Sequence, residues 1–197
     1  MMTLPHTTAA QPGRNLALIA IFAAFIAACS LLPAIPVGPV AVPITLQTLA
    51  VYTVALILGA RRAGLSVALY LLAGLLGLPV FAGGSGGFGV VASPSFGYLL
   101  GFVPGAFIAG FLAYRFLGPS RSKAVTALGL AVSALAGFAV IQVFGVAGMM
   151  VNAHLDLGTA LAAAMIYVPG DLIKCAVAVA IALSVHRAFP ALAGSGR

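Results

Sequence analysis

The chain has 197 residues, of which 63% are apolar and only 6% are charged. Soluble domains carry about 25% charged residues, and a chain of this length cannot bury so many apolar side chains in a core of its own. With a mean hydropathy of +1.23, the composition excludes an ordinary soluble enzyme, a disordered chain and a disulfide-stabilised scaffold. It indicates a membrane protein.

Apolar runs of about the length that crosses a bilayer occur six times, since a transmembrane helix needs about 20 residues. Arg61 and Arg62 divide the second run from the third, because two arginines at the bilayer centre would be costly. The predicted fold is therefore an all-α integral membrane protein, a bundle of six transmembrane helices. The expected spans are about 15–32, 44–58, 64–78, 96–117, 124–150 and 161–185.

Basic residues predict the orientation of this bundle. With six spans, the ends and loops on one side carry Arg14, Arg61, Arg62, Arg115, Arg121, Lys123, Arg187 and Arg197, and the opposite loops carry none. Since cytoplasmic loops are enriched in Lys and Arg, we expect both termini in the cytoplasm. The expected organisation is a flexible cytoplasmic N-terminus (1–13), one membrane domain (14–188) and a cytoplasmic C-terminal tail (189–197).

The loops on the outer side are rich in proline and glycine. Leu32–Pro43 contains several prolines, Phe81–Pro94 contains five glycines, and Val151–Thr159 carries Asn152, His154 and Asp156. Irregular backbone at membrane depth is tolerated only where it is buried in protein or lines a cavity. We therefore expect outer re-entrant loops that close a cavity in the outward half of the bundle.

Two ionisable residues lie inside the sixth run, where Asp171 precedes Lys174 by three positions. If the helix enters the membrane near Leu161, Asp171 lies about 15 Å deep. A charge at the bilayer centre costs roughly 2.5 to 3.5 kcal/mol, so intramembrane charges are functional candidates. The alternative is a self-neutralising ion pair one helical turn apart. Pro169 and Gly170 favour a break in the helix here, with Asp171 near the start of a helical segment.

Other polar side chains in the spans lie toward the outer half. Gln47 can equally face a cavity or pack in the bundle, whereas Thr45 and Thr48 are expected to bond to their own helix. The tyrosines that can line a site are Tyr52, Tyr98 and Tyr167, which can also serve as interfacial anchors. Cys29 and Cys175 match no metal-ligand spacing and read as small buried side chains.

A face of small residues on the first span predicts close approach of another helix, internal or from a separate protein. Ala20, Ala24 and Ala28 recur at four-residue spacing. The chain contains no GxxxxGK[ST] phosphate loop and no series of intramembrane carboxylates. A transporter of this kind would therefore be driven by another subunit.

Four segments, taken in order, resemble one known family. The chain is similar to BioY, the biotin-specific S component of bacterial transporters of the energy-coupling factor (ECF) type. The resemblance rests on the segments 42–51, 77–87, 97–102 and 168–174, which read VPITLQTLAV, GLPVFAGGSGG, GYLLGF and VPGDLIK. The turn before the fourth span departs from the family's usual Gly-Pro-Thr-Gly-Gly-Tyr, since it reads ASPSFGY at 92–98.

This resemblance implies biotin capture at the outer face of the bacterial cytoplasmic (inner) membrane, without a cofactor. It implies two kinds of partner, a membrane-embedded T component and two cytoplasmic ATPases of the ATP-binding-cassette type. Ala20, Ala24 and Ala28 match the face by which such S components dock on the T component. The residues expected to bind biotin are Asp171, Lys174, Gln47, Tyr52, Phe81, Gly83, Gly84, Tyr98 and Tyr167.

Chemistry agrees with this assignment, because biotin offers N–H groups to Asp171, while Lys174 can donate to its ureido oxygen or its carboxylate. Three other functions remain open on the sequence. They are an S component for another vitamin, a self-sufficient secondary transporter or channel, and, more distantly, an intramembrane serine protease that pairs Ser85 of a GxSG turn with His154.

Overall fold

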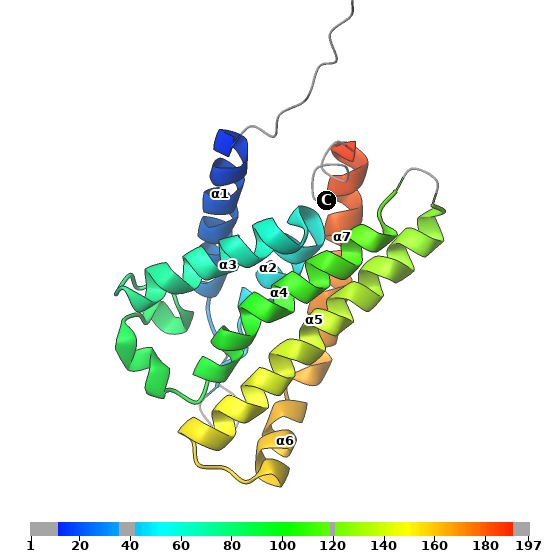
Figure 1. Ribbon diagram of the computed structural model, residues 1–197. Coiled ribbons are helices and arrows are strands. Elements are labelled where there is room, and N and C mark those ends of the chain that lie inside the picture. Colours follow the sequence, from blue (N-terminus) through cyan, green and yellow to red (C-terminus); the bar gives the residue numbers. More distant parts are fainter. Residues whose placement is uncertain (1–11, 36–41, 119–120, 191–197) are drawn as a thin grey trace, which may run out of the picture.

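The computed structural model describes residues 12–35, 42–118 and 121–190, which are mainly helical (Figure 1). The α-helices are α1 (Pro12–Ser30), α2 (Gln47–Leu58), α3 (Ala60–Leu75), α4 (Phe96–Phe116), α5 (Lys123–Asn152), α6 (Leu157–Met165) and α7 (Val168–Ala188). Two short 3-10 helices, η1 (Ala82–Gly84) and η2 (Phe88–Ala92), lie between α3 and α4. The expectations for the N-terminus at 1–11, for part of the first outer loop and for the tail at 191–197 lie outside the described residues.

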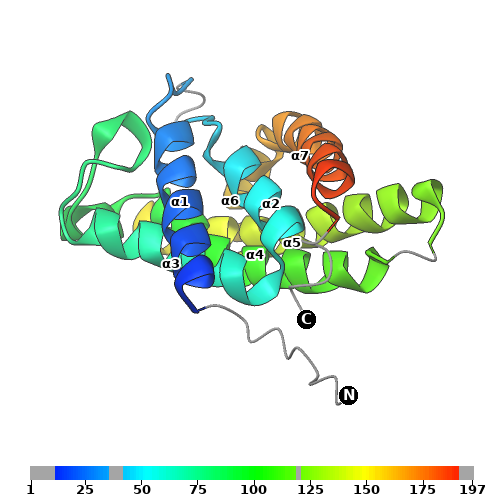
Figure 2. The same ribbon diagram turned by 90° about the horizontal axis from the view of Figure 1, so that it is seen from above.

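The helices pack in two layers that cross at an angle (Figure 2). Helices α1, α2 and α7 form one layer, and α3, α4 and α5 form the other. Helix α2 joins the layers because it packs against α4 as well as α7, and α1 rests on α3. The start of α1 and the end of α7 lie at the same end of the molecule (Figure 1).

Helix α2 carries no charged residue, and ten of its 12 residues are buried. A helix of this kind belongs in the interior of a bundle. It ends at Gly59, whose positive φ of 77° turns the chain directly into α3. The ring of Tyr114 lies 3.0 Å from the position of a Cβ at Gly59, and its hydroxyl donates to the Ile57 carbonyl at 2.7 Å. Only glycine fits this turn.

Among the described residues, four helices are long and apolar enough to cross a membrane, namely α1, α4, α5 and α7. Helix α2 is shorter than expected, whereas α3 begins and ends a few residues earlier than expected. Their lengths are about 18 and 24 Å at 1.5 Å per residue, which is less than the hydrocarbon thickness of about 30 Å. The expected start of α2 at residue 44 is wrong, because Ile44 forms a β-bridge with Ile35 through hydrogen bonds of 2.9 and 2.8 Å. The expected end of α3 at residue 78 is also wrong, since Gly77 has a φ of 107°.

The sixth run is two helices, and the break lies two residues before the expected Pro169–Gly170 position. The chain turns tightly after α6, where the amide of Tyr167 donates to the Ala164 carbonyl at 3.1 Å. Pro169 then occupies the first turn of α7, where its missing N–H costs no hydrogen bond. This start places Asp171 in the first turn of α7, as the sequence predicts.

Helix α6 begins with a side-chain cap in the loop that follows α5. The Asp156 carboxylate accepts hydrogen bonds from the Thr159 amide at 3.1 Å and the Thr159 hydroxyl at 2.6 Å. These two bonds hold the pKa of the Asp156 carboxyl below its ordinary value. The cap fixes the point at which the chain re-enters the bundle.

Glycines bring α4 and α5 into close contact. A Cβ at Gly97 would lie 2.3 Å from the carbonyl oxygen of Phe144 and 2.6 Å from the Cα of Gly148. Gly101 and Gly105 continue the same face of α4 against α5. Small residues at four-residue spacing let helix backbones approach in this way in membranes. The contact holds the start of α4 in place.

Replacing Gly97 by alanine should therefore destabilise the protein by about 1–3 kcal/mol, because the new methyl group forces the α4 and α5 backbones apart. Thermal unfolding in detergent measures the change. Gly118→Ala is the matched control, since nothing lies within 4 Å of its Cβ position. Equal melting temperatures for the two variants would contradict the close contact.

Candidate functional site

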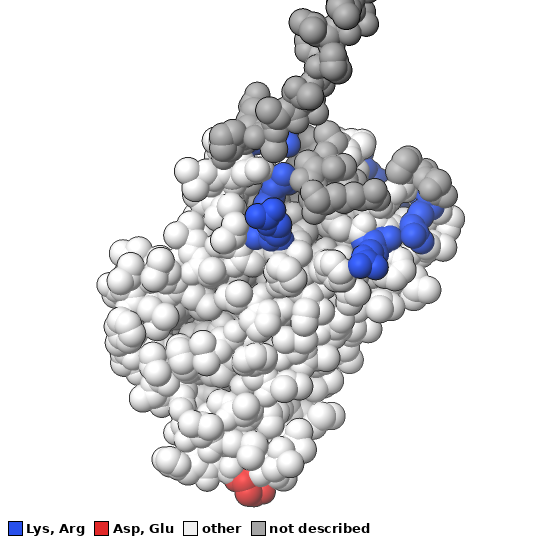
Figure 3. Space-filling view, in the orientation of Figure 1, with Lys and Arg blue, Asp and Glu red and all other residues white. Residues whose placement is uncertain are grey.

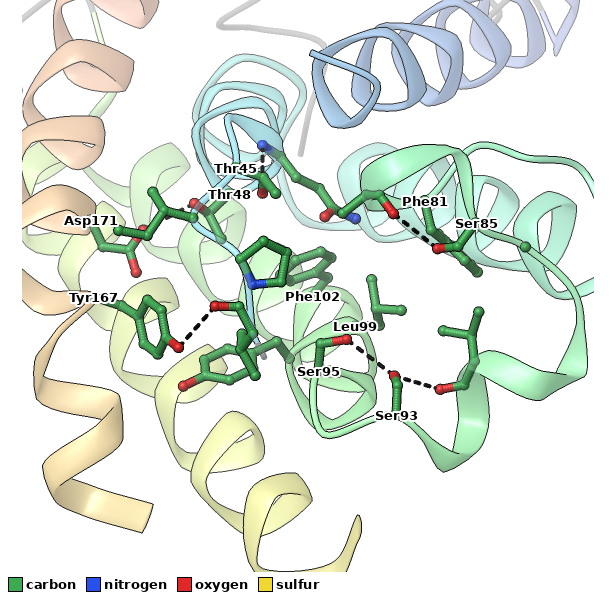
Figure 4. A pocket seen from close by; sticks show the side chains of 18 of the residues that line it. Thr45, Thr48, Phe81, Ser85, Ser93, Ser95, Leu99, Phe102, Tyr167 and Asp171 are labelled. Atoms are coloured by element: carbon green, nitrogen blue, oxygen red, sulfur yellow. Dashed lines mark hydrogen bonds between the residues drawn. The ribbon is translucent and has the colours of Figure 1, made fainter. Parts of the chain in front are cut away.

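A cavity of about 470 Å³ lies between the first turns of α2, α4 and α7 and the glycine-rich loop. Its volume falls within the range of small-molecule sites, about 300–1,000 Å³. Figure 4 shows Asp171, Tyr167 and Thr48 on one side of it and Phe81, Ser85 and Ser93 on the other. A cavity lined by loops is present as predicted, since residues of both the segment before α2 and the loop before α4 line it.

The charged pair on α7 lies in the cavity wall. Lys174 Nζ and Asp171 Oδ1 are 2.9 Å apart, and their side chains are only 12% and 8% exposed. The three-residue spacing places both on one face of the helix. The carboxylate also lies in the first turn of α7, where the unpaired amides of the helix start favour negative charge.

Thr48 completes a three-membered polar cluster with this pair. Its hydroxyl lies 3.0 Å from Asp171 Oδ1 and 3.0 Å from Lys174 Nζ. The expectation that Thr48 bonds to its own helix is wrong, because α2 packs against α7 at this point. The Thr45 hydroxyl, in contrast, accepts a local hydrogen bond from the backbone N–H of Gln47 at 3.3 Å.

Gln47 lines the cavity and is held by residues far away in the sequence. Its side-chain amide donates to the Tyr70 hydroxyl at 2.6 Å, and that hydroxyl donates to the Val80 carbonyl at 3.1 Å. Ser30, at the end of α1, donates to the same carbonyl. No sequence pattern selects Tyr70, because its role depends on contacts between helices.

Aromatic residues form a further part of the lining. Tyr98 and Tyr167 meet edge to face with their ring centroids 6.0 Å apart, and the Tyr167 hydroxyl donates to the Val42 carbonyl at 3.0 Å. The Tyr98 hydroxyl is buried without a hydrogen-bond partner among the described residues. Buried polar groups are normally paired, so this hydroxyl is available to a ligand or a water molecule.

Phe81 anchors the glycine-rich loop at the edge of the cavity. Its ring fills the space above Gly74, where a Cβ would lie 2.2 Å from the ring, and it packs edge to face on Tyr70. The amide of Gly87 donates to the Gly74 carbonyl at 2.7 Å. These contacts hold the loop against the end of α3.

Three of the expected binding residues do not line the cavity. Gly83 and Gly84 shape the loop through φ values of 70° and 72°, while Gly86 and Gly89 take the places on the cavity wall. Tyr52 is one turn beyond Thr48 and is 1% exposed, and its hydroxyl also has no partner among the described residues. It lies behind the lining.

The alanine face of α1 lies on the outer surface of the bundle. Ala20, Ala24 and Ala28 are all exposed, and none of them lines the cavity. The two residues of the serine-protease hypothesis form no pair, since the Ser85 hydroxyl donates to the Ala82 carbonyl at 3.0 Å and His154 is exposed. In the described ranges, no group of three or more His, Cys, Asp or Glu side chains could hold a metal ion.

Known proteins resemble this chain over nearly all of its length. The model of the BioY family matches residues 3–191. "Biotin transporter BioY" of Rhizobium etli is 39% identical over 91% of this chain and 96% of its own. The protein of the same description from Thermotoga maritima is 41% identical over 78% of this chain and 85% of its own.

A solved structure has the same fold. The crystal structure of the S-component for biotin from an ECF-type ABC transporter matches with a TM-score of 0.83 and 28% identity, over 91% of this chain and 95% of that one. The sequence resemblance is thereby confirmed, and the family is one of transporters, not of enzymes. The chain belongs to the BioY family.

Proposed function

We propose that this chain is the substrate-binding S component of an ECF-type importer and that its ligand is biotin, bound in the cavity at the start of α7. The observation that carries the proposal is the buried Asp171–Lys174 pair in the cavity wall of a membrane protein. The proteins that resemble this chain, described as biotin transporters and as the S-component for biotin, support the choice of ligand.

Biotin and the cavity have complementary chemistry. The ureido group of biotin has two N–H donors and one oxygen acceptor, and its rings and tail are apolar. The Asp171 carboxylate can accept from the N–H groups, and Lys174 can donate to the ureido oxygen or to the carboxylate of the tail. Phe81, Leu99 and Phe102 supply apolar walls, as small-molecule sites usually do.

Asp171→Asn and Lys174→Ala should each weaken biotin binding at least tenfold, about 1.4 kcal/mol, because each removes one partner of a buried polar contact. Isothermal titration calorimetry of the purified chain in detergent measures the affinity. The sequence offers matched controls, since the only other aspartate is Asp156 and the only other lysine is Lys123. Asp156→Asn and Lys123→Ala should bind biotin as the unmodified chain does; unchanged affinity in all four variants refutes the assignment.

The proposal includes a topology of six spans with both termini in the cytoplasm. In this topology α2 and α3 are short spans, and α6 and α7 together form one broken span. The missing length of α2 is made up by the segment that lines the cavity, where irregular backbone is tolerated. Figure 3 supports the orientation, because basic side chains gather at the end of the molecule where α1 begins and α7 ends, and the exposed acidic side chain lies at the opposite end.

Cysteine labelling tests this topology in a chain whose native Cys29 and Cys175 are replaced by alanine. A membrane-impermeant maleimide applied to spheroplasts should label Gly158→Cys, at the outer end of α6, and should not label Arg121→Cys before α5. Both positions are exposed, so accessibility differs only by the side of the membrane. The reverse labelling pattern would show the opposite orientation.

We also propose that α1 docks on a membrane-embedded T component, which couples the chain to two cytoplasmic ATPases. The sequence holds no phosphate-binding loop of its own, and the matched crystal structure is of an S-component of an ECF-type ABC transporter. Ala20, Ala24 and Ala28 form an exposed face of small residues on α1, which suits close contact with another helix.

Ala20→Leu and Ala24→Leu should abolish co-purification with the T component while biotin binding by the isolated chain stays unchanged, because the added volume keeps the two helices apart. Affinity purification of the co-expressed complex measures the association. Ala139→Leu, at an exposed alanine of α5, is the control and should leave the complex intact. Loss of the complex in all three variants, or in none, would argue against a docking face on α1.

A further inference from the structure

Thr48 connects α2 to the charged pair on α7, and the ligand chemistry described above assigns it no role. The ammonium of Lys174 can only donate, so the Thr48 oxygen accepts from it across 3.0 Å. The single hydroxyl proton is then directed at Asp171 Oδ1, also at 3.0 Å. The direction of every hydrogen bond in the cluster is thereby fixed.

The two carboxylate oxygens of Asp171 differ in the hydrogen bonds that they accept within the cluster. The hydrogen bonds from Thr48 and Lys174 both end on Oδ1. Oδ2 takes part in neither of them and so keeps its acceptor capacity. The Lys174 ammonium likewise uses two of its three N–H groups, which donate to Thr48 and Asp171, and the third can donate to a ligand. The cluster therefore offers a ligand one acceptor, Asp171 Oδ2, and one donor, the third N–H of Lys174.

We infer that Thr48 is a positioning residue, which fixes the carboxylate and the ammonium in one arrangement before the ligand arrives. The inference rests on the proposed function, in which this pair contacts biotin. A lysine side chain has four flexible carbons, and holding it still before binding lowers the entropy lost on binding. Thr48 is suited to this task because its χ1 angle is stiff and α2 is a buried helix.

The biotin affinity of two Thr48 variants separates the effect of the hydroxyl from the effect of side-chain shape. Thr48→Val keeps the volume and removes the hydroxyl, so it should weaken biotin binding at least tenfold in calorimetry. Thr48→Ser keeps the hydroxyl and should bind within threefold of the unmodified chain. Thr53→Val is the control, because Thr53 is buried on the same helix and its hydroxyl has no partner in the described part of the chain. It should bind normally.

Infrared spectroscopy tests the hydrogen bond between Thr48 and Asp171 in the absence of ligand. The chain has two aspartates and no glutamate, so in an Asp156→Asn background ¹³C-aspartate labels only Asp171 among the carboxylate side chains. Its infrared carboxylate bands should shift in Thr48→Val, because one oxygen loses a hydrogen bond, and return in Thr48→Ser. Unchanged bands in Thr48→Val would show that Thr48 does not bond to the carboxylate and would overturn the inference, whereas a purely structural link between α2 and α7 predicts loss of stability with biotin affinity unchanged.

The outcomes separate this inference from the proposed function. If the unmodified chain does not bind biotin, the proposed function fails, while the infrared bands still test whether Thr48 orients the carboxylate. If it binds and Thr48→Val binds equally well, the positioning role is overturned. Should Thr48→Val fail to fold, Thr48→Cys replaces it, since a thiol is a weak donor and acceptor and should give the same loss of affinity.

Discussion

Two opposite charges held inside an apolar bundle impose the main constraint on this protein. Removing a carboxylate and an ammonium from water costs several kcal/mol per ion, and close contact alone often does not recover that cost. Here Asp171 and Lys174 lie 2.9 Å apart, and Thr48 adds a hydrogen bond to each. Because an apolar pair would satisfy the fold as well, their presence points to a ligand that needs both charges.

The surrounding architecture serves to place this cluster. The break before α7 puts Asp171 in a first helical turn, where free amides favour a carboxylate. Helix α2 brings Thr48 to the pair from the centre of the bundle, and the glycines of α4 hold Tyr98 in the cavity wall. The loop before α4 closes the space, with Phe81 fixed above Gly74. The contacts of Thr48 and of the α4 glycines join segments that are distant in the sequence.

Composition and spacing predicted the membrane class, the charged pair and the broken helix, because these features are local and costly in lipid. The role of Thr48 was missed, since its partners lie 123 and 126 residues further along the chain. Tyr70 was missed for the same reason. Glycine content located the loop but could not tell Gly83 and Gly84, which shape its turn, from Gly86 and Gly89, which face the cavity. Only packing decides which side of a turn faces a ligand.

An experimental structure of the chain with biotin tests the central claim most directly. We expect one biotin molecule inside the cavity, with an N–H of its ureido group within hydrogen-bond distance of the Asp171 carboxylate and an oxygen of the ligand on the Lys174 ammonium. A biotin molecule bound elsewhere, or bound in the cavity without contact to either charge, would contradict it.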